Sequence, residues 1–215
     1  WTPWPDGIHL DLFADMPLIA AARIDLTATP TVDAAALAGF NTQSLCHSDI
    51  LQGGAQAATD FLKDDDGFTR FEVAAGRAGA LRRGVIVRRL LEIETYRNLA
   101  LLGLPLARKV SPRIQHQERT LADLMRRLGE GHGMDASNQA LDTLHRLSLD
   151  VGRTLDEVSY RFAASRAYAD VLRARLDRLE ESPVGEFSTI ARYLENRIEP
   201  AIATLTAINK RLDAL

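Results

Sequence analysis

The densest group of potential metal ligands in the chain is three adjacent aspartates, Asp64, Asp65 and Asp66. A calcium loop with Gly67 at its sixth position would begin at Leu62 and end at Val73, and neither side chain can bind calcium. This spacing excludes an EF-hand. We expect a solvated turn between two strands, whose three carboxylates are weak candidates for binding a divalent metal ion.

A second candidate is the pair formed by Cys46 and His47, because a thiol next to an imidazole could act as nucleophile and base. Adjacent side chains seldom point at each other, and the sequence has no nucleophile-elbow or oxyanion motif. We therefore predict no catalytic residue and no bound cofactor. A single cysteine also excludes an internal disulfide and fits a reducing compartment. The histidines lack the spacing of a zinc site; they are His9, His47, His116, His132 and His145.

Two carboxylates, Glu92 and Glu94, lie in the segment LLEIETYR, where apolar neighbours favour their burial. With Arg88, Arg89 and Arg97 close by, a structural ion-pair network is favoured over acid–base catalysis. The basic residues of this region lack interleaved aromatic residues, so an anionic membrane surface is a better partner than nucleic acid. These residues are Arg77, Arg82, Arg83, Arg88 and Arg89.

Composition and charge indicate two parts. The 215 residues are 46% hydrophobic and carry a net charge of −3. Residues 1–80 hold eleven acidic and four basic residues, whereas residues 81–215 hold eighteen and twenty-two. No run of about 18 apolar residues and no signal peptide is present. Because the chain begins at Trp1 without a methionine, we expect it to start within a longer gene product.

Residues 1–80 have the pattern of strands and turns. We expect a strand over residues 18–27, a short helix over 32–40, and a hairpin with arms at 50–63 and 68–73 around Asp66-Gly67. Gly53-Gly54 in the first arm predicts a bulge or a bend. A phosphate-binding loop is excluded, because no helix beginning with Lys-Ser or Lys-Thr follows the two glycines.

Residues 81–215 have the pattern of helices. We expect helices over 82–110, kinked or ended by Pro105, and over 111–128, begun by Ser111-Pro112 and ended by the glycines of 129–133. A long helix then runs from Asp135 or Ser137 to Glu181. A turn at Ser182-Pro183 and Gly185 leads to the last helix, which we expect to bend at Pro200.

A heptad pattern marks the last two helices and predicts a coiled coil. In the first helix the stripe comprises Leu141, Leu144, Ser148, Val151, Leu155, Val158, Phe162, Ser165, Ala169, Leu172, Leu176 and Leu179. In the second it comprises Phe187, Ala191, Leu194, Ile198, Ala201, Leu205, Ile208, Leu212 and Leu215. Since the second stripe is still in phase at Leu215, we expect this helix to continue in a longer chain.

Several segments together resemble a bacterial family of predicted membrane-anchored proteins of unknown function. They are TDFLKDDDGFTRFEV, RRLLEIETYRNLALLGLPLAR, RFAASRAYADVLRARLDRLEE, PVGEFSTI and YLENRIEPAIATL, in this order between about residues 48 and 215. The resemblance implies C-terminal transmembrane segments beyond this chain, and no catalytic residues are established for the family. The layout is also similar to that of CorA-type divalent cation channels. The motif residues, whose role is unknown, are Asp60, Gly67, Arg70, Glu92, Glu94, Tyr96 and Arg97.

The sequence thus predicts an α+β protein, with a small, mostly antiparallel sheet lobe over residues 1–80 and a helical lobe over 81–215. The helical lobe should end in a long antiparallel coiled-coil hairpin. We expect a non-enzymatic stalk or interaction domain at the cytoplasmic face of the inner membrane, which could form a homo-oligomer through its long helices. The alternatives are the soluble domain of a CorA-like transporter and an unrecognised enzyme.

Overall fold

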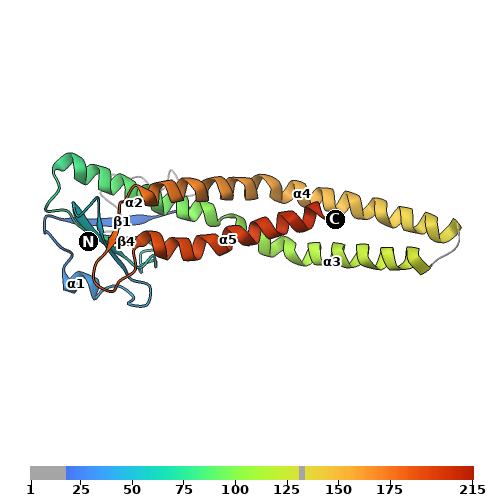
Figure 1. Ribbon diagram of the computed structural model, residues 1–215, viewed down its shortest axis with the longest axis horizontal. Coiled ribbons are helices and arrows are strands. Elements are labelled where there is room, and N and C mark those ends of the chain that lie inside the picture. Colours follow the sequence, from blue (N-terminus) through green and yellow to red (C-terminus); the bar gives the residue numbers. More distant parts are fainter. Residues whose placement is uncertain (1–17, 131–133) are drawn as a thin grey trace. The chain divides into compact units, whose positions relative to one another are not determined.

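The computed structural model describes residues 18–130 and 134–215, without the side chain of Ala136 (Figure 1). They form two compact units, described separately below. The sheet unit contains the residues up to Leu99 and Asp170–Arg197, and the helical unit contains Ala100–Ala169 and Ile198–Leu215. The unit boundaries lie within long helices, whereas the sequence-based division at residue 80 follows the change in composition.

The sheet unit contains one five-stranded mixed sheet with the order β1-β4-β3-β2-β5. Its strands are β1 (Ala22–Thr27), β2 (Cys46–Ile50), β3 (Ala55–Thr59), β4 (Thr69–Ala74) and β5 (Ser182–Pro183). β1 pairs with β4 in parallel, and the other neighbours are antiparallel. The predicted mostly antiparallel sheet was therefore wrong. The β3–β4 hairpin brings β4 back beside β1 in the same direction, after the crossover that contains α1 (Ala34–Leu37).

The predicted hairpin around Asp66-Gly67 is confirmed as β3 and β4. Gly67 has a φ of +85°, and the Asp64 carboxylate accepts hydrogen bonds from the backbone amides of Asp66 and Phe68. The prediction for Gly53-Gly54 was wrong in one respect: these residues form the turn between β2 and β3, with a φ of +78° at Gly53. The separate strand β2 was not predicted, because its polar sequence, CHSDI, has no strand-like alternation.

Four long helices follow β4 in the chain: α2 (Ala80–Leu101), α3 (Gly103–Glu130), α4 (Met134–Asp177) and α5 (Ile190–Asp213). The helix predicted over 82–110, kinked or ended by Pro105, is interrupted at Leu102, three residues before that proline. The helix start predicted at Ser111-Pro112 was wrong, because both residues lie inside α3. Pro105 occupies the first turn of α3, where no backbone donor is required, and Pro112 lies inside the helix. Pro200 likewise lies inside α5.

The helical unit has its core where α3, α4 and α5 pack on one another. Its buried residues are Ala107, Val110, Ile114, Val158, Phe162, Leu205, Ile208 and Leu212. At Gly103 the helices approach so closely that an added Cβ would lie 2.7 Å from a methyl group of Leu205 and 2.9 Å from the Ser165 hydroxyl oxygen. The same hydroxyl accepts a hydrogen bond from the Gly103 amide, which accounts for a serine in the heptad stripe.

The structure does not show the predicted coiled-coil hairpin. The heptad stripe of α5 is buried from Leu194 to Leu212, and that of α4 is buried from Val158 onward. In the first half of α4 the buried stripe is shifted by one residue, to Ala140, Leu147 and Thr154. A straight α-helix has 3.6 residues per turn. A stripe that repeats every 3.5 residues therefore rotates around the helix by about 20° per heptad and moves off the side that faces the neighbouring helix.

This shift revises the expected effect of truncating the stripe. Leu172→Ala should lower the free energy of unfolding by about 2–5 kcal/mol, because the side chain is only 1% exposed. Leu155→Ala should cost less than about 1 kcal/mol, because Leu155 is 37% exposed and leaves little cavity. Chemical denaturation of both variants measures the difference. Equal losses would mean that the heptad stripe is buried along its whole length.

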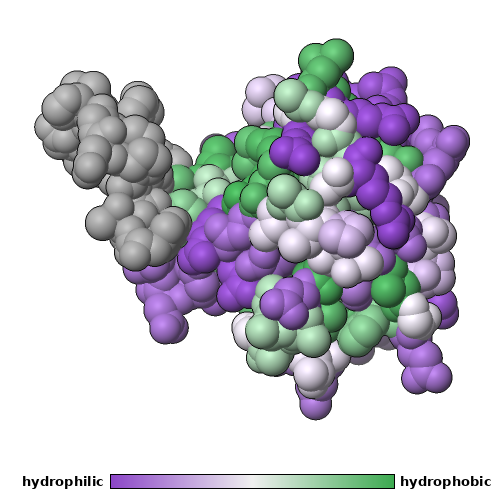
Figure 2. Space-filling view, turned by 90° about the vertical axis from the view of Figure 1, so that its left-hand side faces the viewer, coloured by the Kyte–Doolittle hydropathy of each residue, from purple (hydrophilic) through white to green (hydrophobic). Residues whose placement is uncertain are grey.

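The described helices include none with the length and apolar character needed to cross a bilayer. Figure 2 shows the sheet unit from the left-hand side of Figure 1, and hydrophobic and hydrophilic residues are interspersed on the face turned to the viewer. The large exposed hydrophobic residues of the described chain come from both units, and those of the helical unit include Met125, Leu128, Met134, Leu141 and Leu144.

Candidate functional site

Within the helical unit, α3 and α4 continue past the C-terminal end of α5 (Figure 1). We call this two-helix part, residues 119–130 and 134–149, the arm. Near the end of α5, Arg211 binds the Glu118 carboxylate at 2.7 Å, and Val151 and Leu215 both pack against the core of the unit. These contacts mark which sides of α3 and α4 face α5.

The α5-facing sides of α3 and α4 continue into the arm with apolar residues. Met125 lies seven residues after Glu118, and Leu144 lies seven residues before Val151, about two helical turns in each case. Met125 is 64% exposed, Leu144 is 45% exposed, and Leu141, on the same side of α4, is 64% exposed. We call Met125, Leu141 and Leu144 the open face. The open face continues the surface on which α5 packs nearer the core of the unit. No helix of residues 18–130 or 134–215 lies on the open face itself.

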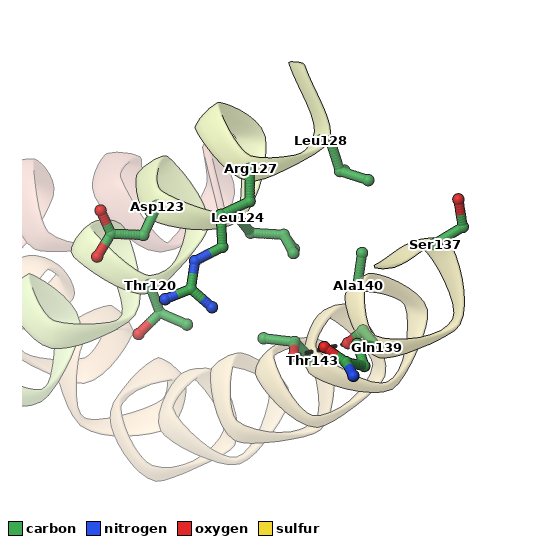
Figure 3. A pocket seen from close by; sticks show the side chains of 9 residues that line it. All are labelled: Thr120, Asp123, Leu124, Arg127, Leu128, Ser137, Gln139, Ala140 and Thr143. Atoms are coloured by element: carbon green, nitrogen blue, oxygen red, sulfur yellow. Dashed lines mark hydrogen bonds between the residues drawn. The ribbon is translucent and has the colours of Figure 1, made fainter. Parts of the chain in front are cut away.

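The two helices of the arm are loosely packed on each other. A groove of about 280 Å³ separates them near the end of the arm (Figure 3). Leu124 and Leu128 of α3 point toward Ala140 of α4, while the Arg127 guanidinium extends into the space beside Thr120 and toward Thr143. Small residues at 140 and 143 leave this space unfilled, so the arm has little core of its own.

Ion pairs fix α3, α4 and α5 where the arm begins. Arg113 and Gln117 both donate to the Asp150 carboxylate, and these hydrogen bonds lower the pKa of Asp150. The hydrogen bonds from Arg211 lower the pKa of Glu118 in the same way. Because both carboxylates ionise more easily in the folded protein than in the unfolded chain, they stabilise the fold at pH values above their ordinary pKa. This stabilisation is lost as the pH falls through their lowered pKa values.

In the sheet unit, two predicted motif residues form a buried ion pair. The Glu94 side chain is 3% exposed, and both of its oxygens accept hydrogen bonds from Arg97 at 2.7 Å. Thr69 and Asn98 donate to the same carboxylate at 2.8 Å. With these four hydrogen bonds, the buried Glu94 carboxylate has partners for both of its oxygens. It also joins α2 to Thr69, the first residue of β4.

The other motif residues lie at separate places. Glu92 pairs with Arg88 at 3.9 Å and with Arg175 of α4 at 2.8 Å, so the expected network includes a partner, Arg175, that the sequence did not indicate. Arg89 instead donates to the carbonyl of Arg178. Among the remaining motif residues, Arg70 stacks on Phe40 and pairs with Glu72, Gly67 forms the hairpin turn, and Tyr96 is half-buried on α2.

The acidic turn binds its own backbone. Asp64 accepts two backbone amides, as described above, and Asp65 and Asp66 are exposed. Across the described ranges, no three or more His, Cys, Asp or Glu side chains come together as a potential metal site. Asp60 accepts the amides of Asn41 and Leu62 and so ties two loops together.

Cys46 and His47 are both buried in β2. Burial raises the pKa of the Cys46 thiol to about 12, so the thiolate needed for nucleophilic attack is disfavoured. Burial lowers the pKa of His47, whose Nε2 lies 3.3 Å from the Gln56 amide oxygen. Nearby, the Glu181 carboxylate accepts the amides of Ile190 and Ala191 at the start of α5, although burial raises its pKa. Of the other histidines, His116 and His145 lie on separate helices, and His9 and His132 lie outside the described residues.

Two residues of the sheet unit that the sequence did not single out lie beside the motif residues. Tyr193 stacks on Phe61 with the rings 5.4 Å apart and 14° from parallel, and Arg197 lies 3.7 Å above the Tyr193 ring. Both come from α5, about one hundred residues after the LLEIETYR segment. The quoted segment YLENRIEP contains them, and the i, i+4 spacing of an aromatic and an arginine is the signal that could have found them.

Comparison with known proteins gives a family but no activity. No curated protein and no solved structure is significantly similar to the chain. One family model, described as a protein of unknown function (DUF3422), matches residues 10–215. This match covers nearly the whole chain, including the arm and the motif residues. The chain therefore belongs to the DUF3422 family of proteins of unknown function.

Proposed function

We propose that this chain is a non-enzymatic interaction domain whose arm binds the arm of a second copy. The open face is the observation that carries the proposal. It continues a surface on which α5 already packs within the helical unit, and its residues are apolar and half to two-thirds exposed. A face of this kind is suited to bind a further helix.

A second copy fits the open face for two reasons. A two-fold pair uses the same face of both chains, so two arms together form a four-helix bundle. The charges of the two helices are also complementary. Within the arm, α3 carries three arginines and two carboxylates, whereas α4 carries two carboxylates and one arginine. A pairing that places α3 of one copy against α4 of the other brings opposite net charges together.

The proposal includes a place for this domain in the cell. We propose a stalk domain of a membrane-anchored protein at the cytoplasmic face of the inner membrane, where the arm joins copies of the protein. The support for this part is the resemblance of the quoted segments to a family of predicted membrane-anchored proteins. Self-association through the arm is independent of it and is tested separately.

The purified chain should form a dimer at micromolar to millimolar concentrations in sedimentation equilibrium. The double variant Leu141→Lys/Leu144→Lys should weaken dimerisation at least about tenfold, which corresponds to about 1.4 kcal/mol, because it places charges on the open face. Tyr160→Lys is the matched control, since Tyr160 is 80% exposed on the same helix and outside the open face. It should leave the dimer unchanged.

Two results would contradict the proposal. One is a strict monomer up to about 1 mM, a concentration at which even a contact of about −4 kcal/mol is half occupied. The other is a dimer that the double lysine variant does not weaken. Thermal unfolding of both variants, followed by circular dichroism, shows that any loss of association is not a loss of folding.

A further inference from the structure

A pocket of about 380 Å³ in the sheet unit is lined almost entirely by hydrogen-bond donors and aromatic rings. Its lining comes from the loop after α1, the loop after β3, and the helices α2 and α5. The residues that matter for its chemistry are Asn41, Ser44, Phe61, Arg97, Tyr193 and Arg197. It is separate from the arm.

Two guanidinium groups are held at this pocket by stacked rings. Arg97 lies 5.2 Å from the centre of the Phe61 ring, Phe61 stacks on Tyr193, and Arg197 lies over the other ring at 3.7 Å. The electron-rich ring faces attract the cations and limit the positions that the long side chains can take. The pocket therefore has two positive groups in defined places before any ligand binds.

The two arginines keep free donors. Arg97 donates from Nε and Nη2 to Glu94, and Nη1 donates no hydrogen bond within residues 18–130 and 134–215. Arg197 is exposed, and no carboxylate in this described part of the chain pairs with it. Its charge nonetheless lowers the pKa values of Cys46 and Tyr193, against the larger effect of burial, which raises both. Positive potential at the pocket is thus not cancelled by a partner of Arg197.

A buried hydroxyl at the pocket also supports a ligand site. Ser44 is 9% exposed, and its Oγ makes no hydrogen bond of good geometry among the described residues, although it lies close enough to the Tyr193 hydroxyl to lower that pKa. Buried polar atoms are normally satisfied. Phe61, which also lines the pocket, has a φ of +57°, a left-handed backbone conformation that costs a non-glycine residue free energy.

We propose that this pocket binds a small ligand through a phosphate group. Two guanidinium groups match a dianion with several acceptor oxygens, and the side-chain NH2 of Asn41 and the hydroxyl of Ser44 supply neutral donors. The binding does not depend on dimerisation through the arm. The phosphate could belong to a soluble molecule or to a lipid headgroup, and the experiment below distinguishes these sources.

Calorimetric titration of the purified chain with inorganic phosphate and with glycerol 1-phosphate, at constant ionic strength, should show one site. Arg197→Gln should weaken this binding at least about tenfold, because a charge-assisted hydrogen bond is lost. Ser44→Ala should weaken it several-fold. Arg192→Gln is the control, since Arg192 is exposed on α5 and outside the pocket.

Co-sedimentation with phosphatidic acid vesicles tests the lipid source. Binding to these vesicles that glycerol 1-phosphate displaces and Arg197→Gln abolishes would assign a lipid headgroup, and binding of the soluble phosphates alone would assign a soluble ligand. The proposal is overturned if neither phosphates nor vesicles bind, or if Arg197→Gln and Arg192→Gln reduce binding equally.

Discussion

Replacing Phe162 by alanine should lower the free energy of unfolding of the helical unit by about 3–5 kcal/mol. Phe162 of α4 is fully buried and belongs to the core cluster that residues of α3, α4 and α5 form together. Its removal should leave a cavity that closes only in part, because α3 and α5 already approach closely at Gly103.

Chemical denaturation followed by circular dichroism measures this effect, with the transition of the helical unit analysed separately if the two units unfold in steps. Tyr160→Ala is the control on the same helix and should change stability by less than about 0.5 kcal/mol, since the side chain is 80% exposed. A loss below about 1 kcal/mol for Phe162→Ala would show that the three helices do not pack in solution as described.

Glu94→Ala should destabilise the sheet unit by about 3–5 kcal/mol, because it leaves the Arg97 cation and two neutral donors without their buried acceptor. The double variant Glu94→Ala/Arg97→Met should recover part of this loss, since the unpaired charge is removed as well. Denaturation of both variants gives the two values. A double variant less stable than Glu94→Ala would contradict the explanation.

Glu92→Ala is the matched control in the same helix. Its carboxylate is 30% exposed and pairs with Arg88 and Arg175, so solvent screens the interaction. We expect a loss of about 0–1 kcal/mol. A loss as large as that of Glu94→Ala would mean that the contact between α2 and α4 within the sheet unit, and not the burial of Glu94, determines stability there.

The sequence predicted those parts of the fold in which neighbouring residues determine the structure. The hairpin at Asp66-Gly67, the long helices, and the buried stripe of α5 were all predicted, because turn residues and helical periodicity act locally. The first half of α4 was predicted wrongly. Its leucines follow a 3.5-residue repeat, but burial depends on where α3 lies, and that places Ala140 and Leu147 inside instead.

The sheet was also predicted wrongly where its pairing depends on residues far apart in the chain. β5 has two residues and pairs with β2, which lies more than 130 residues earlier, so no local pattern indicates it. The parallel pairing of β1 with β4 also depends on the crossover between them.

The candidate sites were predictable only in part. The Glu94–Arg97 ion pair follows from i, i+3 spacing on a helix with apolar neighbours. Tyr193 and Arg197 come close to Arg97 only through the tertiary structure, so the sequence did not indicate them. Leu141 and Leu144 of the open face were present in the sequence as part of the heptad stripe, but their exposure in the described chain is known only from the tertiary structure.

The division of both units along the chain has a consequence for synthesis. The sheet unit takes its last strand and the start of α5 from Asp170–Arg197, so the residues up to Leu99 leave the ribosome with this unit incomplete. All of residues 100–169 must be made before the missing part arrives. Meanwhile β2, which pairs with β5, presents an unpaired edge to other chains. A nascent chain stalled in α4 should therefore be the form most in need of a chaperone.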